Sequence, residues 1–132
     1  MRRITLTAFL LVGVLGAAGC SKVQDAAQQA ADRVQCGATE RLADRLPDAD
    51  RLDPSQMQQG ASIARRIGDV LGRLPGDRVP VSVTEGLDRA ATELDAASAD
   101  FAADPAAAQA RAAAAIAEVR TAITGATADL GC

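Results

Sequence analysis

The near absence of aromatic side chains constrains this chain more than any other feature. Its 132 residues include no Trp, no Tyr and two Phe. Phe9 lies in an apolar N-terminal stretch, so Phe101 is the one aromatic residue beyond it. Aromatic side chains make the largest apolar contributions to most protein cores. A core without them must be built from Ala, Val, Leu and Ile at close helix spacing. Such a core buries modest area per residue, so we expect stabilisation from another source as well.

Apolar residues recur at steps of four and three in four segments, which is the spacing of amphipathic helices. No run of alternating apolar and polar residues is long enough to predict a sheet. The candidate Val79-Pro80-Val81 is interrupted by proline. The fold class predicted is therefore all-α: a small up-down helical bundle with three long helices and one short first helix. The four stripes are Ala38, Leu42 and Leu46; Met57, Ala61, Ala64, Ile67, Leu71 and Leu74; Val83, Leu87, Ala90, Leu94, Ala97 and Phe101; and Ala112, Ile116, Val119, Ile123, Ala126 and Leu130. At the end of its stripe, we expect Phe101 to fill the core beside an interhelical turn.

Local signals predict where these helices begin and end. Capping residues with a partner three positions later, and proline at the first helical position, mark a helix start. The predicted starts are Asp53 with Pro54 and Gln56; Ser82 with Glu85, where Val81 is available for a hydrophobic staple; and Asp104 with Pro105. Gly131 is expected to cap the last helix.

The N-terminal stretch points to export. Met1-Arg2-Arg3 precedes an apolar run, and the run ends in Leu15-Gly16-Ala17-Ala18-Gly19-Cys20. The run is shorter than the roughly 20 apolar residues that a membrane-spanning helix needs. This stretch resembles the lipobox of a bacterial lipoprotein signal peptide. Arg2-Arg3 leaves open whether export follows the general secretory or the twin-arginine route.

The resemblance implies that residues 1–19 are removed as a signal peptide. It further implies that Cys20 is lipidated and becomes the new N-terminus. Two acyl chains on this residue would suffice for stable anchoring. The protein is then lipid-anchored to the bacterial cell membrane, with its folded domain on the extracytoplasmic side. Residues 36–132 resemble no family that we recognise.

If Cys20 carries lipid, two cysteines remain, Cys36 and Cys132. In an oxidising compartment an even remainder predicts one disulfide. The bond would close a loop of about 97 residues and contribute about 4–5 kcal/mol in the chain-entropy model. The alternative is a pair of thiols that are free or joined to another molecule.

The cysteines also suggest a division of the exported chain. We expect residues 20–35 to form a lipidated juxtamembrane tether and residues 36–132 to form the bundle. A helix unbroken from 22 to 46 and packed along the bundle would hold Cys36 near mid-height, far from Cys132, so a break at Cys36-Gly37 is favoured. A first helix of about 16 Å and a connection over 47–53 of up to about 23 Å would then span the bundle.

Few side chains in this sequence are suited to catalysis or metal binding. Histidine is absent, which removes the commonest general base and metal ligand. Asp48, Asp50 and Asp53 could offer oxygens to calcium, but they lack the remainder of an EF-hand loop, and a solvated loop is the favoured interpretation. We therefore expect no catalytic residues, no metal site and no cofactor.

Charge and composition limit the classes of molecule that this protein is expected to bind. The chain has 14 Lys and Arg against 17 Asp and Glu, a net charge of −3, which disfavours nucleic acid. Arg65, Arg66 and Arg73 are expected to form a solvated helix face, with contact to anionic headgroups as the alternative. The expected function is a non-enzymatic structural or protein-binding role in the envelope, with the membrane and an envelope protein or polymer as partners. The alternative is a small-ligand carrier with a cavity between its helices.

Overall fold

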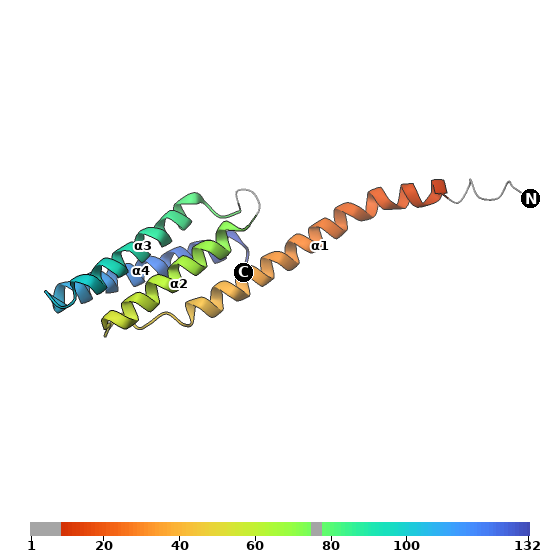
Figure 1. Ribbon diagram of the computed structural model, residues 1–132. Coiled ribbons are helices and arrows are strands. Elements are labelled where there is room, and N and C mark those ends of the chain that lie inside the picture. The colour runs from red at the N-terminus through yellow and green to blue at the C-terminus, as the bar shows by residue number, and fades with distance from the viewer. Residues whose placement is uncertain (1–8, 75–77) are drawn as a thin grey trace, which may run out of the picture. The chain divides into compact units, whose positions relative to one another are not determined.

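The computed structural model describes residues 9–74 and 78–132, with side chains from residue 24 onward. The described chain is helical, with no strand in these ranges (Figure 1). It divides into two compact units, Met1–Val34 and Gln35–Cys132. The all-α helical bundle predicted from the stripes is confirmed. Its helices are α1 (Phe9–Ala43), α2 (Pro54–Gly72), α3 (Val81–Asp100) and α4 (Pro105–Asp129).

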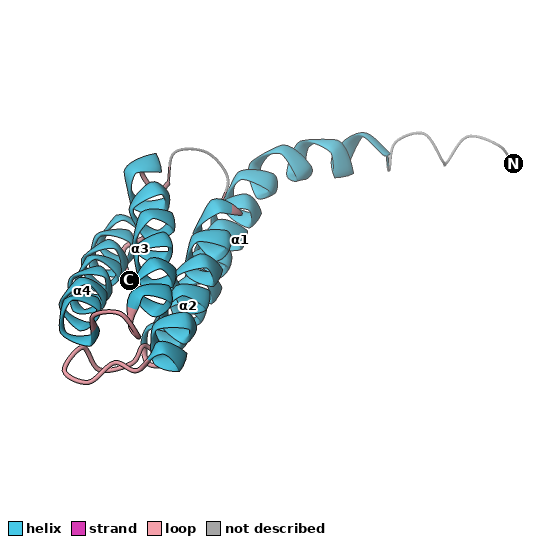
Figure 2. Ribbon diagram, turned by 60° about the vertical axis from the view of Figure 1, so that its left-hand side comes forward, coloured by secondary structure: helices cyan, strands magenta, loops and turns pink. Residues whose placement is uncertain are grey.

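The unit Gln35–Cys132 is built on three long antiparallel helices. α3 packs along both α2 and α4, whereas α2 and α4 touch each other at few positions. Figure 2 shows the three helices side by side, with the α3–α4 turn at one end. The end of α1 and the connection to α2 lie along this group. We call residues 36–52 the strap, because they run from one end of the bundle to the other.

The core is made of small and aliphatic side chains, as the shortage of aromatic residues requires. Leu52, Met57, Ile67, Leu87, Leu94, Ile116 and Val119 are the largest fully buried apolar side chains. Alanines fill the space between them, among them Ala61, Ala90, Ala97, Ala112 and Ala126. Phe101 packs against this core but is only half-buried, so it closes the α3–α4 turn from the edge.

Gly60 marks a close approach of the helices. A Cβ at this position would lie 3.0 Å from Ile116 Cδ1 on α4 and 3.3 Å from Leu94 Cδ1 on α3. The same Cβ would lie 3.7 Å from Pro47 Cγ, so the strap also contacts α2 here. The missing side chain therefore lets four segments meet at one point.

Two predicted helix starts are confirmed. At α2, the Gln56 backbone N–H donates to Asp53 Oδ1 at 2.8 Å, and the Asp53 N–H donates to Gln56 Oε1 at 3.1 Å. This reciprocal pair is a complete capping box, followed by a proline at the first helical position. At α4, the Asp104 carboxylate accepts a hydrogen bond from the Ala107 N–H at 3.1 Å.

The predicted start of α3 is wrong. Pro80, not Ser82, occupies the N-cap, and α3 begins at Val81 with no side-chain cap. Pro80 has an extended ψ of 141°, and its carbonyl accepts the Val83 N–H at 3.0 Å, so the first turn forms before Ser82 is reached. Val81 is 68% exposed and makes no hydrophobic staple.

The favoured break at Cys36-Gly37 is also wrong, because α1 continues through both residues to Ala43. A glycine inside a helix costs only about 1 kcal/mol relative to alanine, and neighbouring turns tolerate that cost. The error was to assume that the whole helix packs along the bundle. Residues 24–34 are exposed apart from half-buried Asp32, so packing against the core begins only near Cys36. The strap keeps the predicted order of a short helical part followed by an irregular connection.

Candidate functional site

The most unusual local geometry lies at the end of α4, where the chain turns back on itself. Gly131 has a φ of +71°, a left-handed conformation that glycine adopts without steric cost. The Cys132 N–H donates to the Thr127 carbonyl at 2.9 Å, and the Gly131 N–H donates to the Ala128 carbonyl at 3.1 Å. These two bonds form a Schellman motif, so the predicted glycine cap is confirmed. The motif fixes the direction in which Cys132 leaves the helix.

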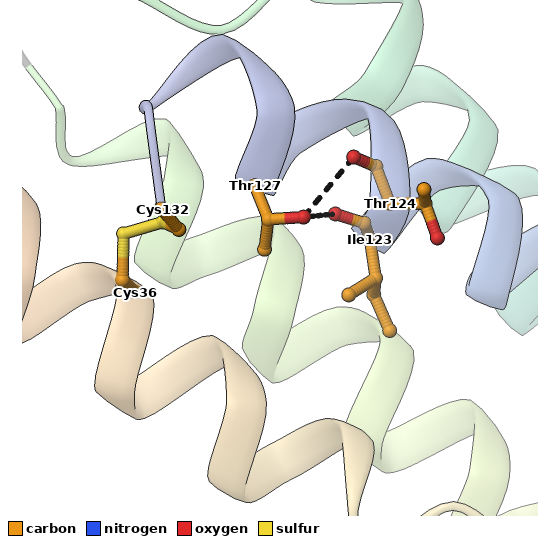
Figure 3. The surroundings of a disulfide bond; sticks show 5 residues. All are labelled: Cys36, Ile123, Thr124, Thr127 and Cys132. Atoms are coloured by element: carbon orange, nitrogen blue, oxygen red, sulfur yellow. Dashed lines mark hydrogen bonds between the residues drawn. A yellow bond between two sulfur atoms is a disulfide. The ribbon is translucent and has the colours of Figure 1, made fainter.

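Cys132 is joined to Cys36 by a disulfide, as the cysteine count predicts (Figure 3). The two Cα atoms lie 6.1 Å apart, within the usual range for a disulfide, and 96 positions separate the residues. Cys132 is exposed and Cys36 is half-buried. The bond therefore connects the start of the strap to an exposed residue at the end of α4.

The hydroxyl nearest to this bond in Figure 3 is committed to α4 itself. Thr127 Oγ1 donates to the carbonyls of Ile123 and Thr124, each at 3.0 Å. No hydrogen bond within the part of the chain that the structure describes connects Thr127 to the sulfurs. The Schellman turn and the covalent bond are thus what hold Cys132 in place.

Thr39, one turn after Cys36, has an unpaired hydroxyl in the interior. Its side chain is fully buried, and Oγ1 has no hydrogen-bond partner among the described residues. A buried polar group without a partner costs about 1–3 kcal/mol. The sequence stripe pointed to Ala38 instead, which is only half-buried. The true inward face passes through Cys36 and Thr39, a spacing of three that the apolar pattern did not reveal.

The far part of the strap is held by apolar burial and one hydrogen bond. Leu46 and Leu52 are buried, with 7% and 1% exposed. Gln109 Nε2 on α4 donates to the Leu52 carbonyl at 2.9 Å. Together with the Asp53 cap, these contacts fix the strap at the end of the bundle opposite the disulfide.

Ion pairs connect the outer faces of the long helices. Arg65 on α2 pairs with Asp95 on α3. Arg111 on α4 reaches back to α3, with Nε 2.6 Å from Glu93 and Nη1 3.3 Å from Asp100. The hydrogen bond from Arg111 to Glu93 raises the guanidinium pKa above its ordinary value. All five side chains are substantially exposed, so these pairs stabilise the bundle little.

Arg65, Arg66 and Arg73 are all exposed, which agrees with the predicted solvated face. Arg65 also pairs with Asp95 on α3. The three acidic residues considered as calcium ligands have different surroundings. The Asp53 carboxylate caps α2, whereas Asp48 and Asp50 are exposed. Within residues 9–74 and 78–132, no cluster of His, Cys, Asp or Glu is arranged to hold a metal ion.

Among the described residues, surface depressions lie on the bundle between neighbouring elements. One of about 370 Å³ lies where the strap meets the α3–α4 turn, and Leu52, Phe101 and Gln109 contribute to its wall. One of about 340 Å³ follows the α2–α3 groove over Ala64 and Gly68. A third of about 280 Å³ lies beside Arg111. All three are open to solvent.

Cys20, the predicted lipidation site, lies within α1 in the unit Met1–Val34, and its side chain falls outside those that the structure describes. Residues 1–8 of the predicted signal peptide also fall outside the described ranges. None of the described helices combines the length and the apolar character that crossing a membrane requires. The lipid anchor stays a prediction from the sequence.

Comparison of the chain with protein-family models, curated proteins and solved structures finds no match.

Proposed function

We propose that this protein is a bacterial envelope lipoprotein, anchored by lipid on Cys20. Its bundle, residues 36–132, would have a non-enzymatic structural or protein-binding role on the extracytoplasmic side. The observation that carries the proposal is the pairing of Cys36 with Cys132, which leaves Cys20 as the one cysteine of the sequence outside this pair. That cysteine follows directly on the apolar run and the small residues of the lipobox-like stretch.

The part of α1 between the two features supports a tether. Residues 24–34 are helical and exposed apart from half-buried Asp32, so they contribute nothing to the core. A solvated helix between the lipid and the bundle would separate the folded unit from the membrane surface. The large share of alanine and glutamine in this stretch suits such a helix, because both residues have high helix propensity.

The absence of histidine from the sequence supports a binding or structural role over catalysis. The two cysteines of the bundle are joined, so neither is a free thiolate nucleophile in the oxidised protein. The partner that we propose is an envelope protein or polymer that contacts the outer faces of the long helices.

Metabolic labelling with a fatty-acid analogue tests the anchor. The full-length protein produced in bacteria should incorporate the label and fractionate with membranes, and Cys20→Ala should lose the label and be released from membranes. The matched control is the double variant Cys36→Ser/Cys132→Ser, which should keep the label. Labelling of Cys20→Ala at the wild-type level, or membrane retention of that variant, would sink the proposal.

The binding role is tested separately by crosslinking the anchored protein in cells and identifying the products by mass spectrometry. A specific crosslinked envelope component supports the role. Failure to recover any product above the level found with an unrelated lipoprotein of similar size would contradict it.

A further inference from the structure

We propose that the Cys36–Cys132 disulfide is a site of thiol–disulfide exchange with a dithiol protein. Reduction at this site would release the strap from the bundle while α2, α3 and α4 stay folded. The inference rests on access to one sulfur, on the weak hold of the strap and on where the bond lies in the chain. It does not depend on the lipid at Cys20.

The first argument is access. Exchange begins when a thiolate attacks one sulfur of a disulfide, so its rate depends on which sulfur can be reached. Cys132 is exposed beyond the last turn of α4, whereas Cys36 is half-buried on α1 (Figure 3). We therefore place the attack at Cys132, the more exposed residue of the pair, on its Sγ in the folded protein.

The chemistry balances with a dithiol protein as the reductant. Its thiolate forms a new S–S bond to Cys132 Sγ, and the Cys36 sulfur leaves as a thiolate that takes up a proton. The second thiol of the reductant then attacks the mixed disulfide and releases Cys132 as a thiol. Two electrons pass to the protein, and the reductant ends as an internal disulfide.

The second argument is the weak hold of the strap apart from this bond. Its helical part contributes half-buried Leu42 and Ala43, and it carries the unpaired Thr39 hydroxyl into the interior. Its far part is held by buried Leu46 and Leu52 and by the hydrogen bond from Gln109 to the Leu52 carbonyl, so full release requires these contacts to open as well. In contrast, the long helices bury apolar faces against one another over most of their turns. The disulfide keeps the first residue of the strap in place. Without the bond, only the noncovalent contacts of the strap oppose the entropy cost of ordering it.

The third argument is position. α4 is 25 residues long, so Cys132 and the Asp53 cap lie at opposite ends of a bundle of about 37 Å. In the oxidised protein the chain joins the bundle at the disulfide. After release, the first fixed point is Asp53, and residues 36–52 can extend to about 56 Å at about 3.3 Å per residue. Redox state would thus set both the reach of the bundle and the end by which it is held.

Hydrogen exchange followed by mass spectrometry tests the release, with the full-length protein in detergent, before and after reduction by a thioredoxin-class dithiol protein. Amides in 36–52 should lose protection by at least about tenfold, and those of α2–α4 should change by less than about twofold. Unchanged protection in 36–52, or equal loss across the bundle, would overturn the proposal.

The reduction rate tests native access. If Cys132 Sγ is attacked in the folded protein, the rate should not respond to urea below the unfolding transition. A rate that climbs with the first additions of urea would mean that exchange requires global unfolding, and the assignment of the site would be wrong.

Variants separate the weak hold from the bond itself. Cys36→Ser/Cys132→Ser should reproduce the released state without reductant. Thr39→Val replaces the unpaired hydroxyl with a methyl group of the same shape, so it should restore part of the protection of 36–52 in the reduced protein. The matched control is Thr121→Val, because Thr121 is an exposed residue of α4 whose hydroxyl donates to the Ala117 carbonyl. Equal behaviour of the two valine variants would contradict the role given to Thr39.

Discussion

The strap and the three long helices share one core but are held in different ways. α2, α3 and α4 bury continuous apolar faces against one another, whereas the strap contributes two buried leucines, an unpaired hydroxyl and a covalent bond. Burial is the main force that secures the long helices, and their exposed ion pairs add little. The strap combines burial with a capping box at one end and a disulfide at the other.

The largest expected difference between the two regions comes from removing one leucine in each. Leu94→Ala empties a fully buried site between α2 and α3 and should lower the free energy of unfolding by about 2–5 kcal/mol. Leu46→Ala in the strap should cost at most about 2 kcal/mol, since the chain around it can close the space. Urea unfolding followed by circular dichroism measures both. Equal losses would mean that the strap is as integral to the bundle as α3.

A smaller effect is expected at the turn that directs Cys132. Gly131→Ala places a Cβ on a residue with a φ of +71°, which costs about 1–2 kcal/mol. Because the turn positions the sulfur, the variant should also form the Cys36–Cys132 bond more slowly. The measurements are thermal unfolding and the rate of thiol loss after reoxidation. Wild-type oxidation kinetics in this variant would show that the turn does not guide the bond.

The junction between strap and core is tested by its cap. Asp53→Ala removes the capping box of α2 and should cost about 1 kcal/mol, seen as a lower midpoint of thermal unfolding. Ser82→Ala is the matched control, because Ser82 lies in the first turn of α3 and makes no cap. A loss at Ser82 as large as that at Asp53 would contradict the assignment of Pro80 as the N-cap.

The smallest effects are expected at two helical glycines. Gly125→Ala meets nothing within 4 Å and should stabilise the protein by up to about 1 kcal/mol through helix propensity. At Gly60, the new Cβ would press on Ile116 at 3.0 Å, so the same gain should be cancelled or reversed. Denaturant titration compares the two variants. A clear gain at Gly60 would show that the meeting point of strap and core has spare room.

The success of sequence prediction followed how local each signal is. The stripes of the three long helices and the Asp53 and Asp104 caps depend on residues within one or two turns, and the structure confirms them. The prediction of Ser82 as the N-cap of α3 failed because Pro80, two residues earlier, is an equally local signal for a helix start. Helix continuity at Gly37 could not be decided locally, since it depended on how much of α1 packs on the bundle.

The candidate site was predicted only in its covalent part. Once the lipobox-like stretch sets Cys20 aside, Cys36 and Cys132 are the two cysteines that remain, and the structure joins them. The burial of Thr39 depends instead on how α1 is rotated about its axis relative to its neighbours. The spacing of apolar residues does not reveal this rotation. Phe101 was placed in the core by its stripe, yet the stripe ends at a turn, where the side chain is only half covered.

The position of the disulfide has a mechanical consequence. A pull on α1 from its N-terminal side would reach Cys36 before any other residue of the strap and pass through the sulfurs into the end of α4. Without the bond, the same tension would extend the strap and reach the bundle only at Asp53. With the bond in place, the load bypasses the strap and is carried by a covalent connection to a helix that is packed along its length.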